Sequence, residues 1–378
     1  MRICHITTVH SARDARIFYR MCRALAQRGF PVEIIAPDGT AETSSVRPSP
    51  WNAVIARAGR IRRITLALRA ALAGTADIYH FHDPELIPMG LLLKALRPAK
   101  SVVYDVHEDY PSMMREKYWI PKPLRSLVAG SVSLSNALAG RWLDGIVTAD
   151  PGVKKDFQRT PTTKILVYYN FPVLSHFESG SEKHSEARAD LVYIGGMSRR
   201  SGVFVLLDAL ALLAKQGVRP SVKLAGYTDG EAGCFEIESA IRNLGLEKHV
   251  ELRGRMPYAQ VPDWIRGGRI GLVTLQAIPK FMKNIPTKMF EYWACGLPVI
   301  ASGLPPIRQF LSDRQNGVLF SPSSAEDLAR AIRFLMEHPD EAESMGRFGQ
   351  KQVFEDWNNE QQINSLVRFY GEVSRNAY

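Results

Sequence analysis

Residues 193–210, YIGGMSRRSGVFVLLDAL, contain the pattern that decides the fold: an apolar run, a glycine-rich turn and an apolar helical stretch. A strand that leads through such a turn into a helix is the repeating unit of a parallel α/β sheet. Gly195 and Gly196 let the backbone approach a ligand closely, and Arg199 and Arg200 can neutralise a phosphate. Because turns need glycine in any case, this motif alone is weak evidence for a phosphate site.

The same alternation extends over the whole chain of 378 residues. Helical stretches such as 17–29 and 202–217 separate apolar runs typical of buried parallel strands. The runs are RICHITTV, VEIIAP, IYHFHD, VVYDVHE, GIVTAD and ILVYYN in the first half, then LVYIGG, VKLAGY, VELRG, IGLVTL, PVIAS and GVLF. The pattern predicts an α/β protein with two doubly wound, Rossmann-like domains, which place ligands at the carboxyl ends of their strands.

Length and composition agree with two domains, since 46% of the residues are hydrophobic and 23% are charged. The polar segment 171–188 lacks a strand pattern and separates the two alternations. We therefore expect an N-terminal domain at 1–170, a linker at 171–188 and a C-terminal domain at 189–355. The stretch 356–378 is expected to form a helix that returns to the N-terminal domain.

Cysteine usage indicates the compartment. Cys4, Cys22, Cys234 and Cys295 lie far apart and form neither a CxxC pair nor a metal-ligand spacing, which favours a reducing compartment without structural zinc. The chain begins with the strand-like MRICHITTV and has no long apolar segment, which argues against a signal peptide or a membrane span. A cytoplasmic location is expected.

The net charge of +10 belongs entirely to the first half of the chain. Residues 1–170 hold 24 Lys and Arg against 14 Asp and Glu, whereas residues 171–378 hold 24 of each. A basic half can bind nucleic acid, an anionic membrane or an acidic substrate. No recognisable nucleic-acid motif is present, so we expect no nucleic-acid partner.

Two segments suggest an anionic membrane surface as a partner. In 56–74, ARAGRIRRITLALRAALAG, five arginines alternate with apolar residues in a helical pattern: Arg57, Arg60, Arg62, Arg63 and Arg69. In 112–130, SMMREKYWIPKPLRSLVAG, methionines and aromatic residues are mixed with basic ones. The alternative is a solvated helix whose arginine stems cover its own core.

A second phosphate-binding element lies at 284–302, NIPTKMFEYWACGLPVIAS. Pro286 and Gly296 bracket a short helix that leads at once into a buried strand. The first turn carries Lys288, although a helix N-terminus already bears partial positive charge, so this end is suited to an anion. Glu291, three residues later on the same face, can accept hydrogen bonds from ribose hydroxyls.

The pattern N-x-P-x-K-x-x-E-Y-x-A-x-G-x-P-V-I resembles glycosyltransferase family 4. The resemblance extends in order over nearly the whole chain, through VHSARDARIFYRMCRALAQRGF (9–30), YHFHDPELIPMG (79–90), YDVHEDYP (104–111) and YIGGMSRRSG. It implies the GT-B architecture, two facing Rossmann-like domains with an interdomain cleft. It also implies a hexosyltransferase-type reaction, in which a sugar passes from a nucleotide-sugar to an acceptor with retention at the anomeric carbon.

Residue roles follow from the resemblance. It implies that His107, Arg199 and Lys288 are catalytic, with Arg199 and Lys288 on the donor diphosphate and Glu291 on the ribose. The other residues implied for the donor are Gly195, Gly196, Arg200, Tyr227, Arg253, Asn284 and Ile285, and those for the acceptor side are His10, Arg13, His82 and Glu108. The alternatives are a structural tyrosine at 227 and a core or supporting histidine at 107.

Three departures from the family pattern affect this assignment. Lys283 stands where many members have the first Glu of a Glu-x7-Glu motif, and Asn284 is the candidate substitute for that carboxylate. Ser201 replaces a basic residue before Gly202, so the diphosphate is expected to rely more on Arg199 or Arg200. HSARDAR replaces a glycine-rich loop after the first strand.

The expected chemistry needs neither a metal nor a cofactor beyond a UDP- or GDP-linked sugar as co-substrate. No DxD motif is present, so cationic side chains must stabilise the leaving diphosphate. The expected acceptor is lipid-linked or a polysaccharide, at the inner face of the cell membrane. Two alternatives are a sugar-nucleotide 2-epimerase and a non-catalytic nucleotide-sugar-binding subunit; glycoside hydrolysis is disfavoured because Glu108 and Asp109, which are adjacent, cannot easily flank one bond.

Overall fold

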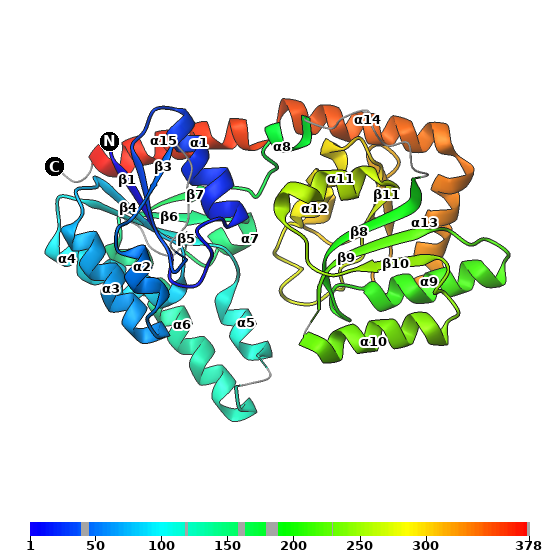
Figure 1. Cartoon of the computed structure of the whole chain (residues 1–378), viewed down its shortest axis with the longest axis horizontal. Helices are drawn as coiled ribbons and strands as arrows, with labels where there is room; N and C mark the ends of the chain where they lie inside the picture. Colours follow the sequence, from blue (N-terminus) through cyan, green and yellow to red (C-terminus); the bar gives the residue numbers. More distant parts are fainter. Residues whose placement is uncertain (39–44, 118–119, 158–162, 179–187, 229, 376–378) are drawn as a thin grey trace. The chain divides into compact units, whose positions relative to one another are not determined.

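The computed structural model describes residues 1–38, 45–117, 120–157, 163–178, 188–228 and 230–375 (Figure 1). The chain divides into two compact units, Met1–Asn170 with Asn359–Tyr378, and Phe171–Asn358. Each unit is built around one parallel β-sheet with helices on both faces. The predicted α/β architecture of two doubly wound, Rossmann-like domains is confirmed.

The first unit has a parallel sheet in the order β3-β2-β1-β4-β5-β6-β7. Its strands are β1 (Ile3–Ile6), β2 (Val32–Ile35), β3 (Val46–Pro48), β4 (Ile78–Phe81), β5 (Ser101–Val106), β6 (Gly145–Thr148) and β7 (Lys164–Val167). Its helices and helical turns are η1 (Ala15–Cys22), α1 (Arg23–Gln27), α2 (Asn52–Ala56), α3 (Arg60–Ala73), η2 (Pro84–Leu86), α4 (Ile87–Leu96), α5 (Tyr110–Glu116), α6 (Lys122–Trp142), α7 (Pro151–Lys154) and α15 (Asn359–Arg375).

Two helical layers cover this sheet. α3, α4 and α6 lie on one face, where buried residues such as Leu66, Leu93 and Ala139 pack under them. α1, η1 and α15 lie on the other face, and the hydroxyl of Tyr370 on α15 lies 2.6 Å from His80 Nδ1 on β4. The C-terminal helix therefore completes the core of the first unit.

The second unit has a parallel sheet in the order β10-β9-β8-β11-β12-β13. Its strands are β8 (Ala189–Met197), β9 (Val222–Thr228), β10 (Val250–Arg253), β11 (Gly268–Val273), β12 (Val299–Ser302) and β13 (Gly317–Phe320). Its helices and helical turns are α8 (Ser175–Glu178), α9 (Val203–Lys215), α10 (Gly230–Asn243), η3 (Tyr258–Gln260), α11 (Val261–Arg266), α12 (Thr287–Ala294), η4 (Ile307–Gln309), α13 (Ala325–Glu337) and α14 (Pro339–Glu355).

Each of the twelve predicted apolar runs overlaps a strand, and the described residues add β3. β3 was missed because it has three residues, ends in Pro48 and lies at the sheet edge, where no apolar run is required. The segment 171–188 begins as part of the second unit rather than as a linker, because Phe171 and Phe177 are buried and the Phe171 ring lies 4.8 Å from that of Phe290. Residues 179–187 lie outside the described part.

The strand order reverses between β1 and β4 in the first unit and between β8 and β11 in the second. In open parallel sheets, the carboxyl ends of the strands at such a point form the usual ligand site. The loops after β1 and β4 hold His10 and His82, Gly195 lies near the carboxyl end of β8, and the chain leads from β11 to Lys288. The fold thus places most of the candidate residues near one of the two strand-order reversals.

Candidate functional site

The carboxyl end of β8 and the loop that follows it, here together called the Gly195 turn, depend on glycine; Gly195 and Gly196 belong to the strand itself rather than to a turn after it. Gly195 has φ +126°, and Gly226, its partner on β9, has φ +150°. A Cβ atom on Gly226 would lie 1.7 Å from the carbonyl oxygen of Gly195, so the two backbones pass in contact. The exposed ring of Tyr227 lies beside Gly196, where a Cβ atom would meet it at 3.2 Å. The turn therefore presents bare backbone with an aromatic ring at its side.

Lys288 reaches this turn from the first turn of α12. Its Nζ lies 3.7 Å from the centroid of the Tyr193 ring, and a Cβ atom on Gly195 would lie 3.5 Å from it. Burial lowers the pKa of the Lys288 ammonium to about 7, although the charge of Glu291 raises it in part. The structure thus joins the two predicted phosphate-binding motifs and leaves a weakly compensated cation where they meet.

Three further candidates lie on α12 or just before it. Glu291 is buried on this helix, one turn after Lys288. Just before the helix, Asn284 Oδ1 is buried and has no hydrogen-bond partner in the described residues, so it can accept a bond from a ligand hydroxyl. Ile285 follows it and is half-buried, as is Lys283, which stands at the position of the expected carboxylate.

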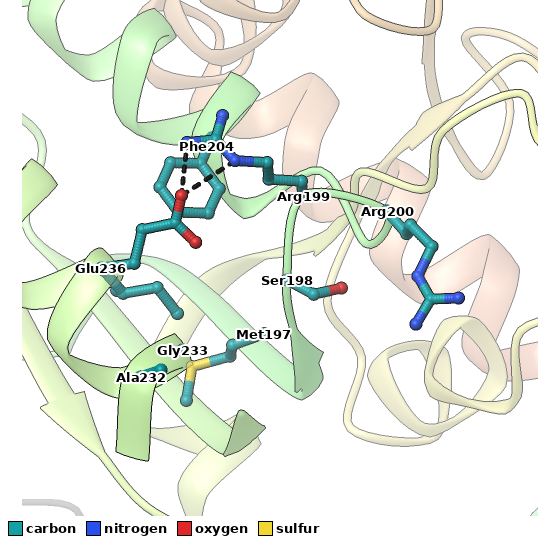
Figure 2. A pocket seen from close by; sticks show the side chains of 9 residues that line it. Met197, Ser198, Arg199, Arg200, Phe204, Ala232, Gly233 and Glu236 are labelled. Atoms are coloured by element: carbon teal, nitrogen blue, oxygen red, sulfur yellow. Dashed lines mark hydrogen bonds and ion pairs between the residues drawn. The ribbon is translucent and has the colours of Figure 1, made fainter. Parts of the chain in front are cut away.

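Arg199 and Arg200 do not act as a pair. Arg199 forms an ion pair with Glu236 of α10, with Nε 2.9 Å from Oε1, and its guanidinium lies over the Phe204 ring at 4.4 Å. Figure 2 shows Arg199 directed at Glu236, while Arg200 points elsewhere. A pocket of about 400 Å³ is lined by Met197, Ser198, Arg199, Arg200, Phe204, Ala232, Gly233, Glu236 and Ile237. The charge of Arg199 is therefore already paired with that of Glu236, whereas the charge of Lys288 is only weakly compensated.

Arg253 lies at the edge of the same sheet. It ends β10, which β9 separates from β8. Its guanidinium donates to Gln260 Oε1 at 3.2 Å and lies 5.5 Å from the centroid of the Trp264 ring. Both of these partners are local, and neither belongs to the Gly195 turn.

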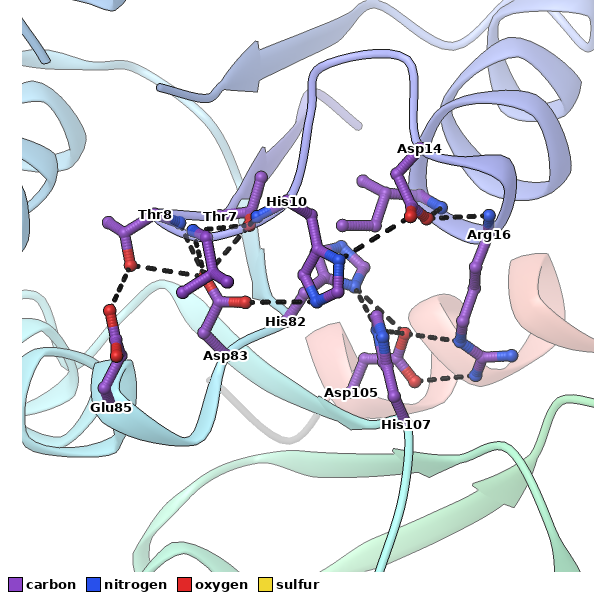
Figure 3. A network of polar contacts seen from close by, with 12 residues as sticks. Thr7, Thr8, His10, Asp14, Arg16, His82, Asp83, Glu85, Asp105 and His107 are labelled. Atoms are coloured by element: carbon purple, nitrogen blue, oxygen red, sulfur yellow. Dashed lines mark hydrogen bonds and ion pairs between the residues drawn. The ribbon is translucent and has the colours of Figure 1, made fainter. Parts of the chain in front are cut away.

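In the first unit, a carboxylate in the core organises the candidate histidines (Figure 3). Asp105 on β5 accepts two hydrogen bonds from Arg16, at 2.7 and 2.8 Å. Its Oδ2 also lies 2.9 Å from His82 Nδ1 and 3.0 Å from His107 Nε2. Burial alone would raise the pKa of Asp105, but Arg16 and His107 hold it well below its usual range. Asp105 is thus an ionised hydrogen-bond acceptor.

These contacts suggest a tautomer for each of the two histidines, whose nitrogens facing Asp105 also lie 3.2 Å from each other. His82 Nδ1 and His107 Nε2 both face Asp105 Oδ2, so we assign a proton to each nitrogen. His82 Nε2 then accepts from His5 Nδ1 at 2.9 Å, which uses both of its nitrogens. His82 is fully buried, and its ring stacks on that of His80 with the centroids 4.8 Å apart. It supports Asp105 and is not open to an acceptor, which corrects its expected role; His107 keeps Nδ1 available.

His10 lies beside His107, with ring centroids 5.1 Å apart. Its Nδ1 lies 3.6 Å from Asp14 Oδ2 and its Nε2 lies 3.5 Å from Asp83 Oδ1. Burial would lower the pKa of His10, but the hydrogen bond to Asp14 and the charge of Asp83 outweigh it, so the pKa is raised. The loop after β1 therefore holds a histidine that favours its protonated form.

The two other acceptor-side candidates are less constrained. Arg13 is exposed, and its backbone N–H donates to Ser11 Oγ at 3.1 Å. Glu108 follows His107 and is half-buried. Their assignment to the acceptor side rests on their positions in the chain.

Among the described residues, the fold brings together two groups whose side chains could hold a metal ion, which the spacing of the cysteines did not indicate. They are His5, His80 and His82, and His82, Asp105 and His107. His82 already uses both of its nitrogens, and both carboxylate oxygens of Asp105 accept bonds from Arg16. Either group would therefore have to break buried hydrogen bonds to take an ion.

Comparison with known families agrees with this arrangement. Residues 15–172 match the model described as Glycosyltransferase Family 4, and residues 176–352 match the one described as Glycosyl transferases group 1. The chain belongs to the family 4 glycosyltransferases, with the GT-B fold. The family that the sequence motifs indicated is therefore confirmed.

Several characterised and uncharacterised glycosyltransferases are similar to this one. An uncharacterised glycosyltransferase of Methanocaldococcus jannaschii is 22% identical over 75% of this chain and 81% of its own. The D-inositol 3-phosphate glycosyltransferase of Paenarthrobacter aurescens is 26% identical over 42% of this chain, and the amylovoran biosynthesis glycosyltransferase AmsK of Erwinia amylovora is 28% identical over 38%. The match spans only 38% and 34% of the lengths of these two relatives.

Solved structures share the fold of this family 4 member. The sucrose-phosphate synthase of Thermosynechococcus elongatus has a TM-score of 0.76 at 17% identity, covering 99% of each chain. Anabaena HepE in complex with UDP has a TM-score of 0.72 at 16% identity, covering 98% of this chain and 100% of its own. At these identities the likeness establishes the fold alone.

Sequence reasoning missed the residues that hold the histidines of this glycosyltransferase. Asp105 and Arg16 form the centre of the network, and Asp83 and Asp14 flank His10. One signal was available: Asp105 is the charged residue of a fully buried strand, and a charge on a buried strand needs a partner. The partner itself could not be identified, because Arg16 lies 89 residues away along the chain.

Proposed function

We propose that this protein transfers a sugar from a nucleotide-sugar to an acceptor hydroxyl. The observation that carries the proposal is the position of Lys288, whose ammonium lies against the Gly195 turn at the carboxyl end of β8. A diphosphate bound there would meet the Lys288 charge, the backbone of the turn and the start of α12. The solved structures of HepE with UDP and with UDP-glucose support a nucleotide-sugar donor.

The proposed donor contacts follow from the local geometry. Glu291 would accept hydrogen bonds from the ribose, and the unpartnered Oδ1 of Asn284 would accept one from a sugar hydroxyl. Tyr227 would form a wall beside the turn. Arg199 would join the diphosphate only by leaving Glu236, so we assign it a smaller part than Lys288. The proposed donor is a sugar linked to UDP or GDP.

The proposed reaction retains the configuration at the anomeric carbon and uses no metal. The acceptor oxygen forms a bond to the anomeric carbon, the bond from that carbon to the phosphate oxygen breaks, and the acceptor proton passes to the departing diphosphate. Lys288 would stabilise the charge that develops on this leaving group. His107, fixed by Asp105, would offer Nδ1 to a sugar or acceptor hydroxyl.

We further propose that the acceptor is lipid-linked or a polysaccharide in cell-surface glycan biosynthesis. The protein would act as a peripheral membrane protein at the cytoplasmic face of the membrane. Relatives named for amylovoran and teichuronic acid biosynthesis support this acceptor class. The four cysteines, none in a disulfide, support a reducing compartment. No helix within the described ranges is long and apolar enough to span a bilayer.

A panel of UDP- and GDP-sugars tests the proposal. Each donor is incubated with the purified chain and a membrane extract that supplies acceptors, and products are separated by mass spectrometry. Sugar transfer with release of nucleoside diphosphate is the expected result. Inversion at C2 without transfer would identify an epimerase instead, and binding of a donor without turnover would identify a non-catalytic subunit.

A further inference from the structure

The outer surface of α3, α4 and α6, here called the helical face, is not used by the proposed reaction. These helices lie side by side: α3 packs against α4, and α4 against α6. Their inner residues fill the core beneath them. The outward side of these helices is unusual for a solvated surface, because it exposes large apolar side chains and its charges are all positive.

α6 has an apolar stripe on its outer side. Ala129 and Ala139 on the inner side are buried, whereas large apolar side chains on the outer side are 41–67% exposed. Their spacing of three, seven, four and four residues follows the helical period. The stripe consists of Leu124, Leu127, Leu134, Leu138 and Trp142. Leu92 and Leu96 on α4 and Ile61 on α3 are also exposed, so apolar exposure continues across the helical face.

The charges on the three helices have one sign. α3, α4 and α6 contain eight Lys and Arg and no Asp or Glu. Neighbouring loops supply some partners: Glu85 pairs with Arg60, and Asp144 pairs with Lys94. Four other cations are exposed and have no ion pair within the described part of the chain, namely Arg62, Arg69, Lys122 and Arg141. The helical face therefore combines apolar exposure with uncompensated positive charge.

This distribution changes the surface expected from the sequence. Of the arginines predicted to bind lipid, Arg60 is paired and Arg63 donates to the carbonyls of Ala58 and Thr8. In the segment 112–130, Tyr118 and Trp119 lie outside the described residues and Ile120 is buried. The apolar contribution comes instead from α6, which the sequence analysis did not single out beyond its first turns.

We propose that the helical face docks on an anionic lipid bilayer, with the α6 stripe among the acyl chains and the free cations at the headgroups. Leucine and tryptophan beside arginine suit the membrane interface, and each cation near an anionic surface strengthens binding about fivefold. A second copy of the chain is the less favourable occupant, because it would place positive charge against positive charge. The inference deepens the membrane location in the proposed function, but it involves no residue of the donor site.

Sedimentation of the full chain with vesicles tests the inference. Vesicles of phosphatidylcholine alone are compared with vesicles in which a third of the lipid is phosphatidylglycerol. The chain should sediment with the anionic vesicles only, and binding should fall as salt is raised. The variant Leu127→Gln/Leu134→Gln/Trp142→Gln and the variant Arg62→Gln/Arg69→Gln/Arg141→Gln should each lose at least tenfold in lipid affinity.

Matched controls come from elsewhere on the molecule. Phe235→Gln/Phe348→Gln/Phe354→Gln removes exposed apolar groups from the second unit, and Arg330→Gln/Arg347→Gln/Arg368→Gln removes exposed charge; both should bind vesicles as the wild type does. All variants should keep the wild-type affinity for UDP or GDP. If the wild type binds vesicles but no nucleotide, the donor site fails while the docking inference stands.

Three results would overturn the inference. They are equal binding to neutral and anionic vesicles, wild-type vesicle binding by the leucine and tryptophan variant, and a dimer in analytical ultracentrifugation that this variant dissociates. The last result would identify a second copy as the occupant. A spectroscopic check is independent of affinity: anionic vesicles should shift the wild-type tryptophan emission to the blue, and Trp142→Phe should reduce this shift.

Discussion

Arg16 and Asp105 form a bidentate ion pair inside the first unit, with Nη2 2.7 Å from Oδ1 and Nε 2.8 Å from Oδ2. The pair joins η1 to β5 and gives His82 and His107 a fixed acceptor. A buried ion pair contributes little net stability, but removing one partner leaves the other charge buried and uncompensated. Both the packing of η1 on β5 and the orientation of the candidate catalytic residue His107 therefore depend on this pair.

Replacing Arg16 should therefore be costly. We expect Arg16→Met to lower the free energy of unfolding of the first unit by about 3–5 kcal/mol. The surface pair of Arg47 and Glu33 offers a matched control, and Arg47→Met should cost about 1 kcal/mol or less. Urea unfolding followed by circular dichroism measures both. Equal, small losses in the two variants would show that Asp105 does not need its partner.

Arg199 and Lys288 should differ in their effect on nucleotide binding. Because Arg199 is paired with Glu236 and lies on the Phe204 ring, a diphosphate would gain its charge only after that pair breaks. We expect Arg199→Ala to weaken UDP or GDP binding about threefold or less, and Glu236→Gln to leave it equal or slightly stronger. Calorimetry measures both. A hundredfold loss of nucleotide affinity in Arg199→Ala would show that this arginine does bind the diphosphate.

Nucleotide binding should take up protons. The pKa of Lys288 in the free protein is about 7, so above pH 7 much of the side chain is neutral, whereas a bound diphosphate favours the ammonium and raises its pKa. The affinity should therefore fall as pH rises from about 7 to 9. Titrations at pH 8 in buffers with different ionisation enthalpies measure the proton number directly. A Lys288→Met variant should lose the uptake; uptake that survives in this variant must come from another group.

Metal removal should leave the reaction intact. If cationic side chains stabilise the leaving diphosphate, transfer in excess EDTA should stay near the untreated rate. Turnover is measured with the donor that the panel identifies. Loss of activity that magnesium or manganese restores would refute this mechanism and direct attention to the groups around His82 and Asp105.

The strands and the need for glycine at the end of β8 could be predicted because their signals are local, although the glycine pair belongs to the strand and not to a turn after it. Buried parallel strands are apolar throughout, and Gly195 must adopt a positive φ where the backbones meet. The pairing of Arg199 with Glu236 could not be predicted, since it depends on the position of α10 relative to the turn. The same holds for Asp105, which needs an arginine from a different helical element.

Burial also separated residues that the sequence treated alike. His82 and His107 both follow or end strands, and both were candidates for contact with a substrate. His82 is fully buried against His5 and Asp105, whereas His107 is only partly buried at the end of the same network. Their difference arises from packing, because His82 is enclosed by His5, His80 and Asp105.

The most direct test of the donor site is the affinity of Lys288→Met for UDP and GDP. The substitution keeps the side-chain stem beside Tyr193 and removes the charge that faces the Gly195 turn. Lys215→Met, at the exposed end of α9 in the same unit, is the control. Calorimetry should show affinity for the preferred nucleotide reduced about tenfold to a hundredfold in Lys288→Met, the value of a lost charge-assisted contact, and unchanged in Lys215→Met. Wild-type affinity in a folded Lys288→Met variant would contradict the account.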